Sequence, residues 1–310
     1  MREDVLRVLG VLKVASAEQV QELTRPHLSV RYPVPHGGRR TKAHRNACLD
    51  LTHRGLVVSE GVSRGRHKLW GLTAAGLEAA AQVLQRPVGE MGSIARGAAT
   101  HGAAHAMDVN ATVLALLQPR PEGPDLERLG RVERAVVEAR PAGLGVLEAM
   151  STEVGLPVTG TEARPGRGSV QADLVLAAPE HRLPLLCVEV DRSTMVPERV
   201  VDKIRRYQLF FERRDRQGQE WWRSRWWAPE GVGPVVALVL SGRSEKSVLT
   251  RAGVVMNLVG GLDTPFPVIG TTLARLGERG PWGETWWNAA GGSPQPLDRA
   301  LGWPVAALDR

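Results

Sequence analysis

The sequence is poor in cysteine and has no long apolar run. Its two cysteines, Cys48 and Cys187, lie within apolar periodic segments, which predicts buried free thiols and leaves no ligand spacing for zinc. No stretch approaches the roughly 20 uncharged residues that a membrane helix needs. The beginning of the chain, "MREDVLRVLG", lacks the apolar core of a signal peptide. We therefore expect a cytoplasmic protein that does not associate with membranes.

Several catalytic motifs are also missing. No glycine-rich phosphate loop occurs, which argues against an NTPase. Neither a Gly-x-Ser-x-Gly element nor a Cys–His arrangement supports a hydrolase that works through a nucleophilic side chain.

The net positive charge is confined to the first quarter of the chain. Residues 1–72 contain 13 Lys and Arg against 6 Asp and Glu, a balance of +7, which equals the net charge of the whole chain. Residues 73–310 are therefore neutral overall. A basic module joined to a neutral one is typical of a domain that binds a polyanion, attached to a domain with another task.

The first 86 residues have the pattern of a winged helix-turn-helix. Helical spacing in residues 2–15 and 16–24 is followed by a basic helix within 39–54, a basic hairpin over 57–73 and a closing helix over 74–84. A winged helix used only for protein contacts is the alternative, but the segregated charge favours double-stranded DNA, bound mostly through phosphates. The candidate DNA-binding residues are Arg39, Arg40, Lys42 and Arg45 of the helix region and Arg64, Arg66 and Lys68 of the wing.

A Gly- and Ala-rich linker at residues 87–102 is expected to lead into a second domain over 103–275, followed by a C-terminal extension over 276–310. The second domain begins with a helix that has His101, His105 and Asp108 on its polar flank. Histidines at this spacing can hold a metal, but without a third ligand a capped or solvent-facing helix is the favoured interpretation.

The second domain is predicted to have an α/β fold. After the first helix come strands at 146–154, 169–178 and 183–191, a helix at 198–211, a strand at 233–242, a helix at 244–259 and a strand at 265–272. The strands at 169–178 and 183–191 form a hairpin, with Asp173 in the first and Glu189 in the second. This order resembles the αβα core of restriction-endonuclease-like proteins, the PD-(D/E)XK superfamily.

That resemblance implies a metal-dependent nuclease site. In the superfamily, an Asp on one strand and an acidic-x-Lys triplet on the next hold one or two divalent cations, and the lysine stabilises the reacting groups. Here the triplet is Glu189-Val190-Asp191, so Asp191 stands at the lysine position. Lys203, on the helix after the strand, is the residue that would supply the missing charge.

The segment from Ala172 to Tyr207, taken with the upstream winged helix, resembles the replication-relaxation family of plasmids and mobile elements. That family has a strand end similar to "EVDRST" (residues 189–194) and then a helix with a lysine and a tyrosine. The resemblance implies a role in replication, or in DNA nicking and relaxation for mobilisation. It makes Asp173, Glu189 and Lys203 catalytic candidates, with Asp191 as a further ligand or positioning group, and Mg²⁺ or Mn²⁺ held by Asp173, Glu189 and Asp191.

Two alternatives to an active nuclease stay open. The strand-end acids can simply pair with Arg192, Arg199 or Lys203, and a degenerate nuclease-like domain would make the protein a non-catalytic, sequence-specific replication or transcription factor. The segment "WWRSRWW" (residues 221–227) can stack unpaired bases, but an aromatic plug over the core is the favoured interpretation. A homodimer would suit a palindromic DNA site.

Overall fold

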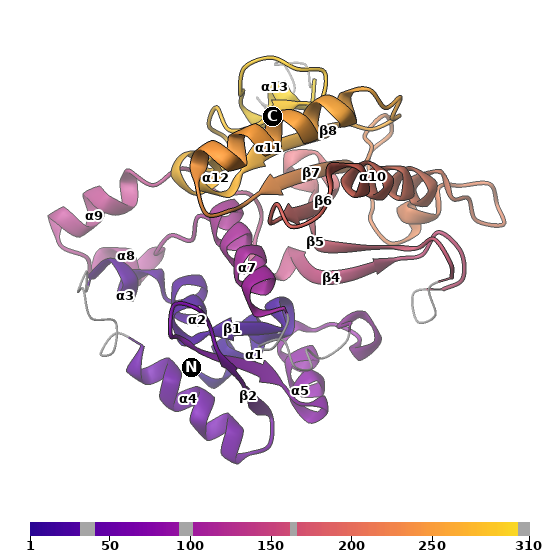
Figure 1. Ribbon diagram of the computed structural model, residues 1–310. Coiled ribbons are helices and arrows are strands. Elements are labelled where there is room, and N and C mark those ends of the chain that lie inside the picture. Colours follow the sequence, from indigo (N-terminus) through magenta and orange to yellow (C-terminus); the bar gives the residue numbers. More distant parts are fainter. Residues whose placement is uncertain (32–40, 93–101, 162–165, 303–310) are drawn as a thin grey trace. The chain divides into compact units, whose positions relative to one another are not determined.

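The computed structural model describes residues 1–31, 41–92, 102–161 and 166–302. These residues form two compact units, Met1–Pro141 and Ala142–Arg310, and each is treated separately below. Both units combine helices with a sheet (Figure 1), so the α/β class expected from the sequence is confirmed.

The N-terminal unit begins with a helical layer and a small sheet. Its strands form an antiparallel sheet in the order β1-β3-β2. The elements in chain order are α1 (Arg2–Leu12), β1 (Val14–Ser16), α2 (Ala17–Thr24), α3 (Pro26–Arg31), α4 (Lys42–His53), β2 (Val57–Val62), β3 (Lys68–Leu72) and α5 (Ala74–Leu84).

Local chemistry sets the boundaries of these elements. Ser16 caps α2 by accepting a hydrogen bond from the Gln19 backbone while the Gln19 side chain accepts one from the Ser16 backbone. Thr73 caps α5 in a similar way. A side chain at Gly76 would collide with the Leu56 carbonyl oxygen, so glycine is required where α5 passes this backbone.

The same unit continues through η1 (Val88–Glu90), α7 (Ala103–Leu117), α8 (Gly123–Glu127) and α9 (Arg131–Glu138). Buried Asn110 of α7 donates hydrogen bonds to the Val14 carbonyl at 2.7 Å and to Gln19 Oε1 at 3.1 Å. Helix α7 therefore belongs to the first compact unit, although its apolar stripe led us to expect it in the second domain. The unit extends past the expected linker at residues 87–102.

The second unit is built on a six-stranded sheet in the order β4-β5-β6-β7-β8-β9. Strands β4, β5 and β6 are antiparallel, β6, β7 and β8 are parallel, and β9 returns antiparallel at the edge. The elements are η2 (Leu147–Ala149), β4 (Met150–Leu156), β5 (Val170–Ala178), η3 (Pro179–His181), β6 (Leu183–Asp191), α10 (Pro197–Glu212), η4 (Trp221–Ser224), β7 (Val235–Leu240), α11 (Glu245–Gly260), β8 (Val268–Thr272), α12 (Leu273–Arg279), β9 (Trp287–Asn288) and α13 (Leu297–Ala300).

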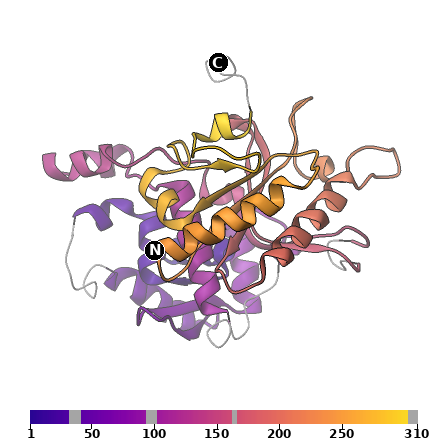
Figure 2. The ribbon, with the colours of Figure 1, turned by 45° about the horizontal axis from the view of Figure 1, so that its top comes forward.

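Helices α10 and α11 lie side by side over one face of this sheet (Figures 1 and 2). Every residue of β6 and β7 is buried, which explains why both strands read as continuous apolar runs. Tyr207, Phe210 and Phe211 of α10 pack into the core beneath the helices. The free thiols of Cys48 and Cys187 are buried as expected.

The tryptophan-rich segment is mostly part of this core. Trp222 is fully buried, and Trp221 and Trp226 pack partly buried against the same cluster, which is the aromatic plug favoured by the sequence. Trp227 is 71% exposed. The guanidinium groups of Arg213, Arg223 and Arg225 lie over the rings of Trp221, Trp222 and Trp226 at 4.6, 4.5 and 5.0 Å.

The C-terminal extension adds a short strand and a buried tryptophan. Strand β9 pairs with β8, and Trp286 beside it is fully buried. Across the part of the chain that the structure describes, no helix is both long and apolar enough to cross a membrane.

Candidate functional site

Two carboxylates lie side by side on neighbouring strands. Strands β5 and β6 form the expected hairpin, and the pairing of Val175 with Cys187 sets Asp173 opposite Glu189. Asp173 Oδ2 accepts a hydrogen bond of 2.8 Å from the Val190 backbone. The strand register thus brings together two acids that are 16 positions apart in the chain.

Helix α10 supplies both partners of Glu189. Lys203 donates a hydrogen bond to Oε2, and Tyr207, one turn further along the helix, donates one to Oε1. The pKa of the Glu189 carboxyl is raised to about 8, first by burial and then by the nearby Asp173 carboxylate, while Lys203 and Tyr207 act in the opposite direction. Glu189 is therefore an acid whose charge depends on the cations around it.

The cluster has a buried side and an open side. Tyr207 is fully buried, whereas the Lys203 side chain is 26% exposed and Asp173 is 17% exposed. Lys203 Nζ also lies 3.9 Å from Asp173 Oδ1, so its ammonium group sits between the two carboxylates. A ligand from solvent would meet Asp173 and Lys203 first.

Asp191 has partners outside this cluster. Asp191 accepts hydrogen bonds from the Ser193 backbone at 2.9 Å and from Arg251 Nε of α11 at 2.8 Å. Asp191 is 4% exposed and the Arg251 side chain is 13% exposed, so the two form a buried ion pair. The expected positioning of Lys203 by Asp191 has no counterpart among the contacts described for these side chains.

Sequence reasoning missed two functional partners. Arg251 lies in the helix predicted at residues 244–259. No local pattern links it to Asp191, 60 positions earlier. The apolar spacing of this helix places Tyr207 on its buried face, and that pattern alone does not predict its hydrogen bond to Glu189. Its spacing of four residues from Lys203 places both on one side of α10, which is a signal that could have assigned it to Glu189.

Two of the three predicted metal ligands, Asp173 and Glu189, adjoin each other, and the third, Asp191, is paired with Arg251. Among the residues with described positions, no group of three or more His, Cys, Asp or Glu side chains could hold a metal, and this includes the flank of α7 at His105 and Asp108. Asp173 and Glu189 supply two carboxylates. Mg²⁺ commonly binds one or two protein carboxylates and completes its shell with water and phosphate oxygens.

The candidate DNA-binding residues that the structure describes are all exposed. Lys42 and Arg45 lie in the first turn of α4, and Arg64 and Arg66 lie in the turn between β2 and β3. Lys68 begins β3 with its ammonium 4.2 Å from the centre of the Trp70 ring. The predicted contacts Arg39 and Arg40 lie outside the described residues.

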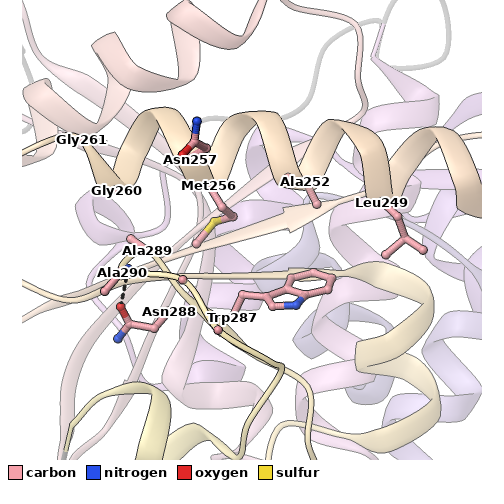
Figure 3. A pocket seen from close by; sticks show the side chains of 13 residues that line it. Leu249, Ala252, Met256, Asn257, Gly260, Gly261, Trp287, Asn288, Ala289 and Ala290 are labelled. Carbon is pink, nitrogen blue, oxygen red and sulfur yellow. Dashed lines mark hydrogen bonds between the residues drawn. The ribbon is translucent and has the colours of Figure 1, made fainter.

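A separate cavity of about 620 Å³ lies between α11 and the segment around β9 (Figure 3). Its lining includes Met256, Asn257 and Trp287, and none of the charged residues of the carboxylate cluster contributes to it. The lining carries no ionisable side chain, so it offers no acid or base.

Comparison with known proteins assigns the class of this chain. A family model described as replication-relaxation matches residues 6–221, which is more than half of the chain. The chain belongs to the replication-relaxation family, as its sequence resemblance predicted, and this indicates a role in the replication of a plasmid or mobile element. The searches of curated proteins and of solved structures gave no match.

Proposed function

We propose that this protein binds double-stranded DNA through its N-terminal unit and nicks or relaxes DNA by metal-dependent phosphodiester hydrolysis in its second unit. The observation that carries this proposal is the grouping of Asp173, Glu189 and Lys203 on β5, β6 and α10. Two adjoining carboxylates with one lysine are the groups that such a reaction needs.

The topology of the N-terminal unit supports DNA binding. Helices α1, α2 and α4 together with the β2–β3 hairpin follow the order of a winged helix, in which a late helix enters the major groove and the hairpin reaches the backbone. Lys42 and Arg45 lie on the helix, and Arg64 and Arg66 lie at the hairpin tip, where they are exposed. Each position suits contact with phosphate.

The topology of the second unit supports a nuclease-like core. Three antiparallel strands lead into two parallel ones, with α10 and α11 over one face, as expected for the restriction-endonuclease-like order. The acids lie on β5 and β6, the strands that carry them in that superfamily. Lys203 reaches them from α10, while Asp191 occupies the triplet position and pairs with Arg251.

Each residue of the cluster has a separate role in the proposed reaction. Asp173 and Glu189 would hold Mg²⁺ or Mn²⁺, which supplies polarisation of a phosphate oxygen and a water of lowered pKa. Tyr207 holds one oxygen of Glu189 from the buried side and so fixes the orientation of the carboxylate. Lys203, at the open side, is placed to neutralise charge on the phosphate as it is attacked.

A second candidate function is a DNA-binding replication factor without catalysis. Its supporting observation is that both oxygens of Glu189 already have donors and that Asp191 is tied to Arg251. In that case the cluster is a structural ion pair that remains from a nuclease-like ancestor.

Incubation of supercoiled plasmid bearing the element's own origin with full-length protein and Mg²⁺ or Mn²⁺ separates the two. Relaxation that is lost in Asp173→Ala and in Glu189→Ala supports the enzyme. Asp202→Ala is the matched control, because Asp202 is an exposed acid on α10 whose described partner is Arg205. Tight binding without relaxation on the correct origin, in both metals, favours the non-catalytic factor.

A further inference from the structure

Three basic residues form a ridge along α10. Arg199, Lys203 and Arg206 are spaced four and three positions apart, which places them on one side of the helix. Lys203 turns into the carboxylate cluster, and Arg199 and Arg206 flank it along the helix. The two arginines are named here the flanking pair.

The positive charges of the flanking pair are not neutralised by ion pairs within the described part of the unit. Both side chains are exposed, and neither forms an ion pair with another residue of the described ranges. Asp202, an acid of the same helix, pairs with Arg205 at 3.1 Å. Lys203 contributes little net charge to solvent because Asp173 and Glu189 surround it. The positive field on this side of α10 therefore comes from the flanking pair.

The spacing suits a nucleic-acid backbone. At a rise of about 1.5 Å per residue, Arg199 and Arg206 are roughly 10 Å apart along the axis. Each strand of DNA advances about 3.4 Å per nucleotide along a duplex, so the pair spans about three nucleotides. Guanidinium groups bind phosphates with two parallel hydrogen bonds, which a Lys ammonium cannot do.

From these observations we propose that the flanking pair binds two phosphates about three nucleotides apart, on either side of the position presented to Lys203, Asp173 and Glu189, and so holds one DNA strand across the cluster. This inference rests on the proposed function and adds a strand-binding surface in the second unit. It is distinct from the exposed basic residues of the N-terminal unit, which belong to α4 and the β2–β3 turn.

The test compares two full-length variants that each lose two positive charges. The ridge variant is Arg199→Gln with Arg206→Gln. The control is Arg205→Gln with Arg216→Gln, since both are exposed residues of the same unit that lie off the ridge. Fluorescence anisotropy in EDTA, at several KCl concentrations, measures binding of a labelled single strand of mixed sequence and of the corresponding duplex.

The ridge variant should bind the single strand about tenfold more weakly, and its salt slope should fall by about 1.4, since each single-strand phosphate contributes about 0.7. The control should remain close to wild type, and the melting temperatures of all three proteins should agree. Equal losses in the ridge variant and the control, or no loss in either, would overturn the inference.

Failure of the proposed function has a different signature. If wild-type protein leaves origin plasmid unchanged while the ridge variant still loses single-strand binding, the cleavage proposal falls and the strand-binding surface stands. If wild-type protein relaxes the plasmid and the ridge variant binds and relaxes normally, only the surface is refuted.

Discussion

Tyr207 donates a hydrogen bond to Glu189, and both side chains are buried beneath α10. Burial also raises the pKa of the tyrosine hydroxyl well above its usual range, so the group remains a donor at all ordinary pH values. The carboxylate thus has a fixed partner on its inner side and an exchangeable one, Lys203, on its outer side. Ligand access can change the second contact without disturbing the first.

Replacement of Tyr207 by Phe keeps the ring and removes only this donor. Leaving a buried acceptor without its donor costs about 1–3 kcal/mol, so we expect the free energy of unfolding to fall by about 2 kcal/mol in urea denaturation. Glu189→Gln and the double variant complete a cycle that isolates the contact. Strictly additive effects in that cycle would show that Tyr207 and Glu189 are not coupled.

Removal of Arg251 should lower the free energy of unfolding more than removal of the Tyr207 hydroxyl does. Arg251→Leu leaves the buried Asp191 carboxylate without its cation, and breaking a buried pair in this way costs about 3–5 kcal/mol. The double variant Asp191→Leu with Arg251→Leu removes both charges and should recover most of the lost stability. Chemical denaturation of wild type and of these two variants measures the difference. A double variant as unstable as Arg251→Leu alone would contradict the ion-pair account.

The carboxylate pair could be predicted from the sequence because its geometry is local. A short turn joins the two apolar strands, and a one-residue register shift between Leu176 and Ala178 then sets Asp173 beside Glu189. The position of Lys203 follows from the helical repeat after Pro197.

Two other features depend on tertiary packing that no local pattern reports. Asp191 could have paired with Arg192, Arg199 or Lys203 by proximity in the chain, but α11 brings Arg251 to it. Helix α7 shows an apolar stripe that fits either unit. It belongs to the first compact unit, where its buried Asn110 donates a hydrogen bond to the Val14 carbonyl.

The burial of His44 predicts that the folded protein loses stability in mild acid. It lies fully buried on α4, and neither ring nitrogen has a hydrogen-bond partner within the described chain. Burial lowers the pKa of His44 below its ordinary value of 6.5. A lowered pKa in the folded state means that the histidine contributes stability above pH 6.5 and that this contribution is lost as the pH falls through the folded-state pKa.

The measurement is urea denaturation of wild type and His44→Leu between neutral pH and about pH 5, where a single group can change the free energy of unfolding by at most about 1.4 kcal/mol per pH unit. Wild type should lose stability relative to the variant as the pH is lowered. His53→Leu is the control, because it removes another histidine near the end of the same helix. Parallel pH profiles for wild type and His44→Leu would refute the prediction.

The basic face of α4 predicts a salt-dependent contact with duplex DNA. Lys42→Ala with Arg45→Ala removes two exposed charges from the first turn of the helix. Each duplex phosphate contact contributes about 0.9 to the slope of log affinity against log salt, so the variant should bind more weakly and show a slope smaller by about 1.8. The control is Arg128→Ala with Arg131→Ala, exposed cations of the same unit that lie away from α4 and the β2–β3 turn. Because both variants lose the same charge, a general electrostatic effect would lower the two slopes equally, whereas a recognition helix lowers only that of Lys42→Ala with Arg45→Ala.

An unchanged slope in the variant Lys42→Ala with Arg45→Ala would remove α4 from the DNA interface and leave the β2–β3 turn as the contact to test next.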